Sequence, residues 1–455
     1  MGCEGLPRRR TRGAAAPMGA GPWVARGLLA AAFAILATAA CAQEPKPPPE
    51  HLVSGWSDDL SDRGYDLSLE YKAEVAGNLS GGLRRGLDYS HLIIASADLD
   101  GQKLWGLNGF KLHGAFVNVA GNSLSSDALG DNLLAVQDAY VPDVTVGARL
   151  AWLYAEQSLW DDRLNLAAGR LPVHRDYARS DFYCRFMSTA ICGGPHTLPA
   201  QVAFTDLPFA TWGARARVKL GAGFSATVGA YEVNPVHGGP SGFDWSTAKS
   251  TGTLYPVELT FEPGGEDANL PGHYKLGWMY DSSSYPDLFD SAAGPPIAVT
   301  GAPGREHRGR PTGYLLADQM LVRHGKGPTA GLVAFGGFVR SDPETFTLAQ
   351  LSFLGLSDEG LLASRPKDTA GLLVAHAKVS SSLRRTEELQ QALGEPLVGD
   401  AAGPQRDEWV VEANYAVHVR DGLTLMPDVQ YVRWPGAVRS SGEALVLGMR
   451  ADVHF

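Results

Sequence analysis

One stretch of the sequence, residues 172–210, gathers side chains that could bind a polar solute. Guanidinium and carboxylate groups can exchange hydrogen bonds with hydroxyl groups, and aromatic rings can stack on the apolar face of a ring-shaped solute. The stretch is therefore a candidate binding site, although each charged residue could instead be ordinary solvated lining. Its charged and aromatic residues are Arg175, Asp176, Tyr177, Arg179, Asp181, Phe182, Tyr183, Arg185 and Phe186.

The same stretch contains two cysteines, Cys184 and Cys192, in CRFMSTAIC. Two nearby cysteines in an oxidising compartment favour a disulfide, which would restrict the conformations of the loop. Two unpaired thiols are the alternative. A metal site is disfavoured, because two thiols without a further Cys or His at ligand spacing supply half of a tetrahedral site. We expect no cofactor.

Further along, WGARARVKL places a cation at every second position: Arg215, Arg217 and Lys219. Alternate residues of a strand share one face, so these three side chains would form a basic row. One hypothesis is a transverse field between this row and carboxylates on other strands; the alternative is a simply solvated wall. The carboxylates in question are Glu70, Glu74, Glu156 and Glu412.

The elements that position these residues alternate between apolar and polar positions. In YDLSLEYKAEV (65–75), aromatic and aliphatic residues fall on one face and mostly charged residues on the other. This period of two is typical of strands with one apolar and one polar face. We predict strands at 65–75, 88–99, 109–119, 148–159, 163–171, 211–220, 223–232, 255–262, 273–281, 313–323, 329–339, 345–356, 369–379, 408–419, 423–433 and 443–455.

The links between these strands alternate in length. WDDR (160–163), GAGF (221–224) and RDG (420–422) are short. Long loops rich in Gly, Pro and Ser lie at 172–210, 233–254, 282–312 and 380–407, the last with helical spacing at 382–393. This sorting favours an all-β fold, a transmembrane antiparallel β-barrel of about sixteen strands with short periplasmic turns and long external loops.

The chain ends with VLGMRADVHF, residues 446–455, in which alternate positions are apolar up to Phe455. A soluble protein would normally blunt such an edge strand. In a barrel the last strand pairs with the first, and its apolar face meets lipid. The terminal Phe455 resembles the signal that the barrel-assembly machinery reads, so that machinery is an expected partner.

The N-terminus predicts export. The apolar run GLLAAAFAILATAA at 27–40 is too short to span a membrane and precedes a small-residue cleavage site, which predicts a signal peptide at 1–42. Either Met1 or Met18 could be the start. A Pro-rich periplasmic linker would follow at 43–62 and the barrel at 63–455. The net charge of −10 disfavours nucleic-acid binding, which requires an excess of basic residues.

Five motifs together resemble the carbohydrate-selective porin family of the OprB type. They are EVAGNLSGG (74–82), LYAEQSLWDDRLNLAAGRL (153–171), SDFYC with the second Cys and Gly193, GAYEVNP (229–235) and LTLMPDVQYVRWPG (423–436). The resemblance covers about 60–455. It implies a sixteen-stranded barrel in the bacterial outer membrane that passes sugars by diffusion, without catalysis.

The resemblance also bears on the pore. Residues 172–210 are the third external loop, which in general porins folds into the barrel and narrows it. Glucose-type members carry arginines on the strand leading into GNSLS (121–125), whereas this chain reads FVNVAGNSLS. The resemblance therefore does not extend to a preference for glucose.

Several alternatives stay open at this stage. A channel that passes small hydrophilic solutes without selection is the main one, and sequence alone does not separate it from a sugar-selective channel. A barrel enzyme is disfavoured because neither G-x-S-x-G nor H-E-x-x-H occurs. A soluble secreted β-sandwich would not sort its links by length. The channel could be a monomer or a trimer.

Overall fold

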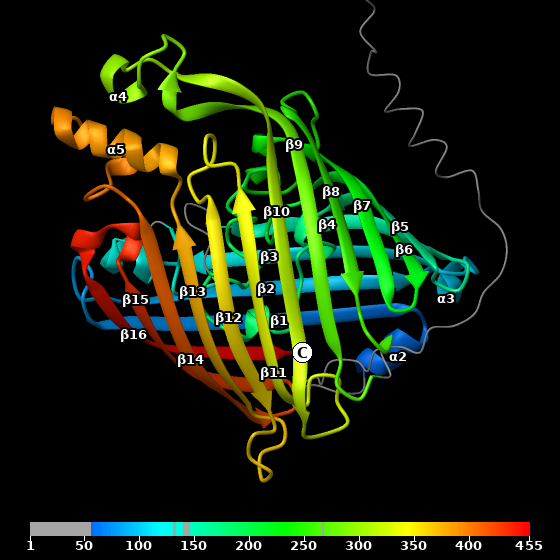
Figure 1. The fold of residues 1–455 in the computed structure, drawn as a ribbon. Helices are drawn as coiled ribbons and strands as arrows, with labels where there is room; N and C mark the ends of the chain where they lie inside the picture. The colour runs from blue at the N-terminus through cyan, green and yellow to red at the C-terminus, as the bar shows by residue number, and fades with distance from the viewer. Residues whose placement is uncertain (1–55, 131–132, 140–145, 266–267) are drawn as a thin grey trace, which may run out of the picture. The chain divides into compact units, whose positions relative to one another are not determined.

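The described part of the chain folds into one closed β-barrel (Figure 1). The computed structural model describes residues 56–130, 133–139, 146–265 and 268–455, so the predicted signal peptide lies outside it. Within these residues, sixteen antiparallel strands follow one another around the barrel in chain order, as predicted. They are β1 (Tyr65–Ser80), β2 (Leu87–Asp100), β3 (Phe110–Gly121), β4 (Val146–Leu159), β5 (Leu164–Leu171), β6 (Thr211–Gly221), β7 (Phe224–Val233), β8 (Gly252–Phe261), β9 (Gly272–Ser291), β10 (Gly304–Arg323), β11 (Gly331–Ser341), β12 (Gln350–Glu359), β13 (Thr369–Lys378), β14 (Asp407–Arg420), β15 (Leu423–Arg433) and β16 (Glu443–His454).

The first and last strands close the barrel. Strand β16 pairs with β1 in an antiparallel register that sets Tyr71 opposite Val453 and Val75 opposite Met449. The backbone N–H of Phe455 donates to the carbonyl of Leu69 at 2.9 Å. Closure leaves no unpaired sheet edge, which explains why the chain can end on an apolar alternating strand.

Alternate residues of each strand face outward and inward. On β1 and β16, Val75 and Met449 face outward and are 38% and 46% exposed, whereas the inward Glu74 and Ala76 are fully buried. An outer surface this apolar suits a lipid environment. Among the described residues, no helix combines the length and hydropathy that a membrane crossing requires.

The barrel has two distinct ends. At the turn end, where β1 begins and β16 finishes, several links are very short, such as 160–163, 222–223 and 421–422. At the loop end, the long links are 122–145, 172–210, 234–251, 292–303 and 379–406. We name residues 122–145 loop L2 and residues 172–210 loop L3. The sorting of links by length is the one the sequence predicts.

Four α-helices lie outside the strands in the described residues. They are α2 (Trp56–Asp62), α3 (Gly101–Trp105), α4 (Ile297–Thr300) and α5 (Ser381–Leu393). Helix α5 matches the helical spacing of the sequence, since the Ser380 hydroxyl accepts hydrogen bonds from the N–H groups of Ser382 and Leu383 and Gly394 ends it in the left-handed region. Helix α2 occupies the end of the predicted linker, residues 43–62.

Several boundary predictions are wrong; for example, β1 continues to Ser80, five residues beyond its predicted end at 75. The predicted loop 282–312 is mostly strand, because β9 and β10 continue past their neighbours as a two-stranded ribbon next to α4 and α5 (Figure 1). Its inward face is polar, with Ser283 and Asp287 buried, so the residue types resemble those of a loop. The strand predicted from 345 begins at Gln350.

Candidate functional site

Loop L3 crosses the interior of the barrel and bonds to strands on several sides. The N–H of Ala178 donates to Glu258 on β8 at 2.8 Å, and the hydroxyl of Ser180 donates to Asp318 on β10 at 3.2 Å. The amide of Asn414 on β14 donates to the carbonyl of Arg185 at 3.0 Å. The loop therefore lies across the path between the two ends of the barrel.

One side of the interior carries many buried apolar side chains, several of which pack against L3. We name it the packed wall; it comprises inward residues of β10 to β16, including Leu316, Val333, Phe335, Leu351, Phe353, Leu373, Val410, Val432 and Val446. The Phe182 ring of L3 stacks on Phe335 with ring centres 6.2 Å apart, and Tyr183 meets Phe353 edge-on at 5.4 Å. Such pairs add to the free energy gained by removing apolar area from water. The packed wall therefore fixes the position of L3.

The tip of L3 is cross-linked and bonded through its backbone. A disulfide joins Cys184 and Cys192, as the sequence predicts. The Arg450 guanidinium of β16 donates to the carbonyls of Cys184 at 3.0 Å and Phe186 at 3.2 Å. The cross-link and these bonds hold the tip against the packed wall.

Buried glutamates on the strands accept hydrogen bonds from backbone N–H groups of both loops. Glu412 accepts from Met187 and Ser188, and Glu74 accepts from Ala139 of L2 at 2.9 Å. Glu74 and Glu412 are fully buried. The prediction that these two carboxylates line the pore and contact solute is therefore wrong, because the infolded loops cover them.

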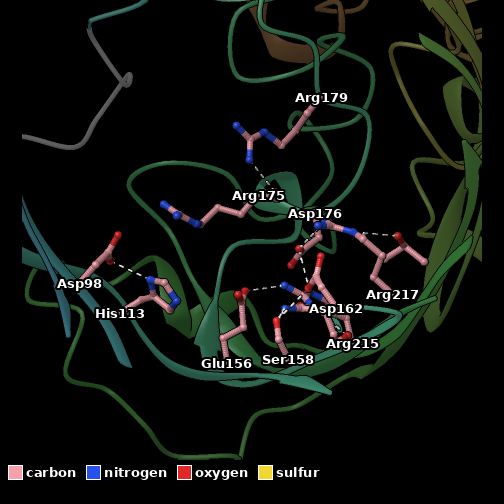
Figure 2. A network of polar contacts seen from close by, with 12 residues as sticks. Asp98, His113, Glu156, Ser158, Asp162, Arg175, Asp176, Arg179, Arg215 and Arg217 are labelled. Atoms are coloured by element: carbon pink, nitrogen blue, oxygen red, sulfur yellow. Dashed lines mark hydrogen bonds and ion pairs between the residues drawn. The ribbon is translucent and has the colours of Figure 1, made fainter. Parts of the chain in front are cut away.

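The opposite side of the interior is polar. We name it the polar strip; it comprises inward residues of β2 to β6, namely Asp98, His113, Glu156, Arg215, Arg217 and Lys219. Figure 2 shows all of these except Lys219. The predicted basic row is present here. Its members are not a bare like-charge row, because carboxylates from a turn, from β4 and from L3 lie beside them.

Arg215 is the centre of these ion pairs. Its guanidinium donates to Asp176 of L3 and to Glu156 of β4, both at 2.8 Å, and its side chain is 3% exposed. Arg217 shares Asp176 at 3.2 Å and is 41% exposed. Lys219 pairs with Asp162 in the turn at 2.8 Å. The strip thus changes from buried and paired at Arg215 to partly exposed at Arg217 and Lys219.

Aromatic and histidine side chains extend the strip toward β2. His113 bonds to Asp98 at 2.7 Å and stacks on the Tyr154 ring with centres 4.6 Å apart. The Arg175 guanidinium of L3 lies 4.5 Å from the centre of the Trp152 ring. His113, Trp152 and Tyr154 are themselves buried, so these contacts hold Asp98 and Arg175 in place and leave no open ring face for a solute.

The remaining predicted residues lie apart from one another. Glu70 is at the turn end, 4.0 Å from His454. Arg179 and Asp181 are exposed on L3. Arg185 bonds to Glu359 and Ser357 of β12, both at 3.0 Å. The structure therefore brings Glu156, Asp176, Arg215, Arg217 and Lys219 together and leaves the other candidates outside that cluster.

Sequence reasoning missed the contribution of loop L2. Ala135 of L2 exchanges hydrogen bonds with Thr189 of L3, its N–H donating to the hydroxyl at 2.7 Å and its carbonyl accepting from the N–H at 2.8 Å. Lys72 of β1 pairs with Asp138 at 2.9 Å. The segment 133–139 carries no charged or aromatic cluster that would have marked it.

Sequence reasoning also missed four strand residues, Asp98, His113, Trp152 and Tyr154, although the period of two places them on inward faces.

Burial and neighbouring cations change the proton affinity of groups within L3. Burial lowers the pKa of His174 to about 3, with Arg179, Lys275 and Arg175 adding to the effect. Burial also lowers the pKa of His196 to about 4. Burial raises the pKa of Asp206 to about 8. The interior of L3 therefore favours neutral forms of its titratable groups.

Comparison with known proteins places this geometry among porins. Residues 84–455 match the family described as carbohydrate-selective porin, OprB family. Porin B of Pseudomonas aeruginosa is 29% identical over 437 residues, covering 92% of this chain and 95% of that protein. The putative porin QuiX of Acinetobacter baylyi is 25% identical over 424 residues, covering 89% and 93%.

Solved structures show the same barrel. The high-pH structure of OprB from Pseudomonas putida has a TM-score of 0.81 at 30% identity and covers 88% of this chain and 96% of that chain. Its low-pH structure has a TM-score of 0.53 at 22% identity over 88% and 95%.

Proposed function

This chain belongs to the carbohydrate-selective porin family OprB, and we propose that sugars cross its barrel along the polar strip, past loop L3. The protein is an outer-membrane carbohydrate channel and not an enzyme. In the proposed path the turn end faces the periplasm and the loop end faces outward, with L3 narrowing the channel between them.

The observation that carries the proposal is the difference between the two sides of the interior. The packed wall is covered by L3, whereas Glu156, Arg217 and Lys219 of the polar strip keep partly exposed side chains. A solute that avoids the packed wall therefore meets partly exposed, charged hydrogen-bonding groups. Carboxylates and guanidinium groups can replace the water that sugar hydroxyls lose in a narrow channel.

Conductance of the refolded protein in a planar bilayer, with a panel of sugars added, tests the proposal. We expect current steps that fall in a saturable way as sugar is added. We further expect weaker sugar block when Arg217 is replaced by Gln, but not when the exposed Arg308 of the β9–β10 ribbon is replaced in the same way. Current steps that no added sugar reduces would instead show that the protein is a general diffusion channel, which passes small hydrophilic solutes without selection.

We also propose that the C-terminal strand is the segment that the barrel-assembly machinery recognises. Phe455 completes the apolar alternation of β16, and its backbone N–H donates to the carbonyl of Leu69 on β1, a contact that any residue except proline can make. Substitution of Phe455 by Ala should reduce the amount of barrel inserted into the outer membrane and leave the conductance of inserted channels unchanged. Normal insertion of the variant would contradict the proposal.

A further inference from the structure

Two guanidinium groups of L3 have no carboxylate partner among the described residues. The Arg175 guanidinium lies over the rings of Trp152 at 4.5 Å and Tyr154 at 5.7 Å, and it makes no ion pair. Arg179 donates to the carbonyl of Arg175 at 3.0 Å and makes no ion pair either. Figure 2 shows the two side chains one above the other, extending in the same direction from L3.

The carboxylates around these two arginines are engaged elsewhere. Asp176 pairs with Arg215 at 2.8 Å and with Arg217 at 3.2 Å. Asp98 bonds to His113 at 2.7 Å. Glu258 accepts from the N–H of Ala178 and the hydroxyl of Tyr314. Asp181 is the exception: it makes no ion pair among the described residues, but its charge acts on Arg179, where it offsets part of the repulsion from Arg175. Lys275, which donates to the carbonyl of Arg179 at 2.7 Å, adds a third cation. A local excess of positive charge is left at Arg175 and Arg179.

The backbone that carries the pair is held in place. The N–H groups of Val173 and His174 donate to the hydroxyl and the carbonyl of Thr205, both at 3.1 Å. The N–H of Ala178 donates to Glu258 at 2.8 Å. Because both ends of this turn are bonded, little conformational entropy would be lost when a ligand meets the two arginines.

The electrostatics of the neighbourhood agree with an excess of positive charge. The pKa of His174 falls to about 3 through burial, with further contributions from Arg179, Lys275 and Arg175. Two guanidinium groups held on one short turn repel each other, and an anion placed between them would convert that repulsion into two charge-assisted contacts. Carboxylate and phosphate oxygens both suit this geometry.

We propose that Arg175 and Arg179 form an anion subsite in the channel, which gives preference to monosaccharide derivatives carrying one carboxylate or phosphate group. This inference rests on the proposed function, since it names the class of sugar that the path along the polar strip admits. The anionic group would contact the two arginines while the ring lies over the polar strip. Neutral sugars pass the same path without that contact.

Flux into proteoliposomes tests the subsite. The full barrel is reconstituted and the entry rates of glucose, gluconate and glucose 6-phosphate are compared at low salt. We expect at least one anion to enter about tenfold faster than glucose, and the ratio to fall to about one in the double variant Arg175→Gln/Arg179→Gln. The variant Arg63→Gln/Lys103→Gln removes the same charge outside the strands and should leave the ratio unchanged.

The outcomes separate this inference from the proposed function. A ratio at or below one for both anions, or an unchanged ratio in the double variant, overturns the subsite and leaves the sugar channel intact. A failure of glucose itself to enter overturns the proposed function. A preference for gluconate or for glucose 6-phosphate identifies a carboxylate or a phosphate as the group bound.

A second measurement avoids dependence on the folding of the variant. The anion-to-glucose ratio of the unaltered protein should decline as ionic strength rises from about 0.05 M to about 0.5 M, because salt screens charges that are exposed to water. A ratio that stays constant over this range overturns the subsite.

Discussion

The packed wall and the polar strip face each other inside one barrel, yet they hold loop L3 by different means. On the packed wall, rings such as Phe335 and Phe353 bury apolar area against L3. On the polar strip, Arg215 and Arg217 hold L3 through the single carboxylate of Asp176. The contrast suggests a division of labour, in which one side positions the loop and the other presents chemistry to the solute.

The division has an energetic basis. Apolar packing is not weakened by electrostatic screening and has no directional requirement, so it suits a fixed support for the loop. Ion pairs that are partly exposed contribute little to stability because water and salt screen them. Arg217 and Lys219, with side chains 41% and 52% exposed, can therefore exchange partners with a passing solute at low cost.

The largest effect should follow from Phe335→Ala on the packed wall. Phe335 is 2% exposed and contacts Phe182, Tyr183 and Phe186 of L3, so truncation should cost about 3–5 kcal/mol. We expect L3 to loosen and single-channel conductance to rise about twofold, as pore width increases.

The matched control is Phe338→Ala, since Phe338 faces outward on the same strand and is 40% exposed. It should leave conductance unchanged. A folded Phe335→Ala barrel with unaltered conductance would show that the packed wall does not position the loop.

A smaller effect should follow from removing the disulfide with Cys184→Ser/Cys192→Ser. The cross-link closes a short loop, so its loss should cost about 2–3 kcal/mol of local stability. Arg450 and Glu412 still hold the tip. We expect noisier current steps with the same mean conductance. A shift in the mean as large as that of Phe335→Ala would place the main support of L3 in the disulfide.

On the polar strip, Arg217→Gln should change recognition more than stability. The pair with Asp176 is partly exposed, so unfolding free energy should change by less than about 1 kcal/mol. Loss of a charged donor should weaken sugar block by up to about tenfold. The apparent affinity for sugar in bilayer recordings measures this. A large loss of stability without a change in block would assign Arg217 to the scaffold.

The smallest effect concerns pH. His174 and His196 lie in L3 with pKa values of about 3 and about 4, below the ordinary value of 6.5. Above pH 6.5 both histidines are neutral whether L3 is folded or unfolded, so they cost no stability. As pH falls below 6.5, the unfolded state takes up protons that the folded loop excludes, and the stability of L3 falls progressively toward pH 4 and then pH 3. Current noise should rise over that range and rise less in His174→Gln. An identical rise in the variant would exclude His174 as a contributor.

Much of the fold was predictable because a barrel repeats one rule. The period of two in stretches such as 65–75 and 408–419 placed each strand and its lipid-facing side. The rule failed for β9 and β10, where Ser283 and Asp287 are buried inside a ribbon that leaves the barrel wall. Polar residues in a polar interior carry no signal that separates strand from loop.

The site was predictable only in part. The alternation of Arg215, Arg217 and Lys219 fixed their common face, and the cysteine pair marked the tip of L3. The exposure of Glu74 and Glu412 was not predictable, because it depends on which loops fold inward. Sequence gives the face of a strand residue, whereas the covering of that face by a loop far along the chain is a tertiary property.

The glutamate contacts to loop backbones have a consequence for how such a channel can change. Glu74, Glu258 and Glu412 hold N–H groups of Ala139, Ala178 and Met187, and every residue except proline supplies that group. The contacts therefore do not depend on side-chain identity, although burial still limits the size of the side chains at Ala139, Ala178 and Met187. The glutamates thus fix the loop backbones, and exposed L3 side chains such as Arg179 and Asp181 can be changed without removing these contacts.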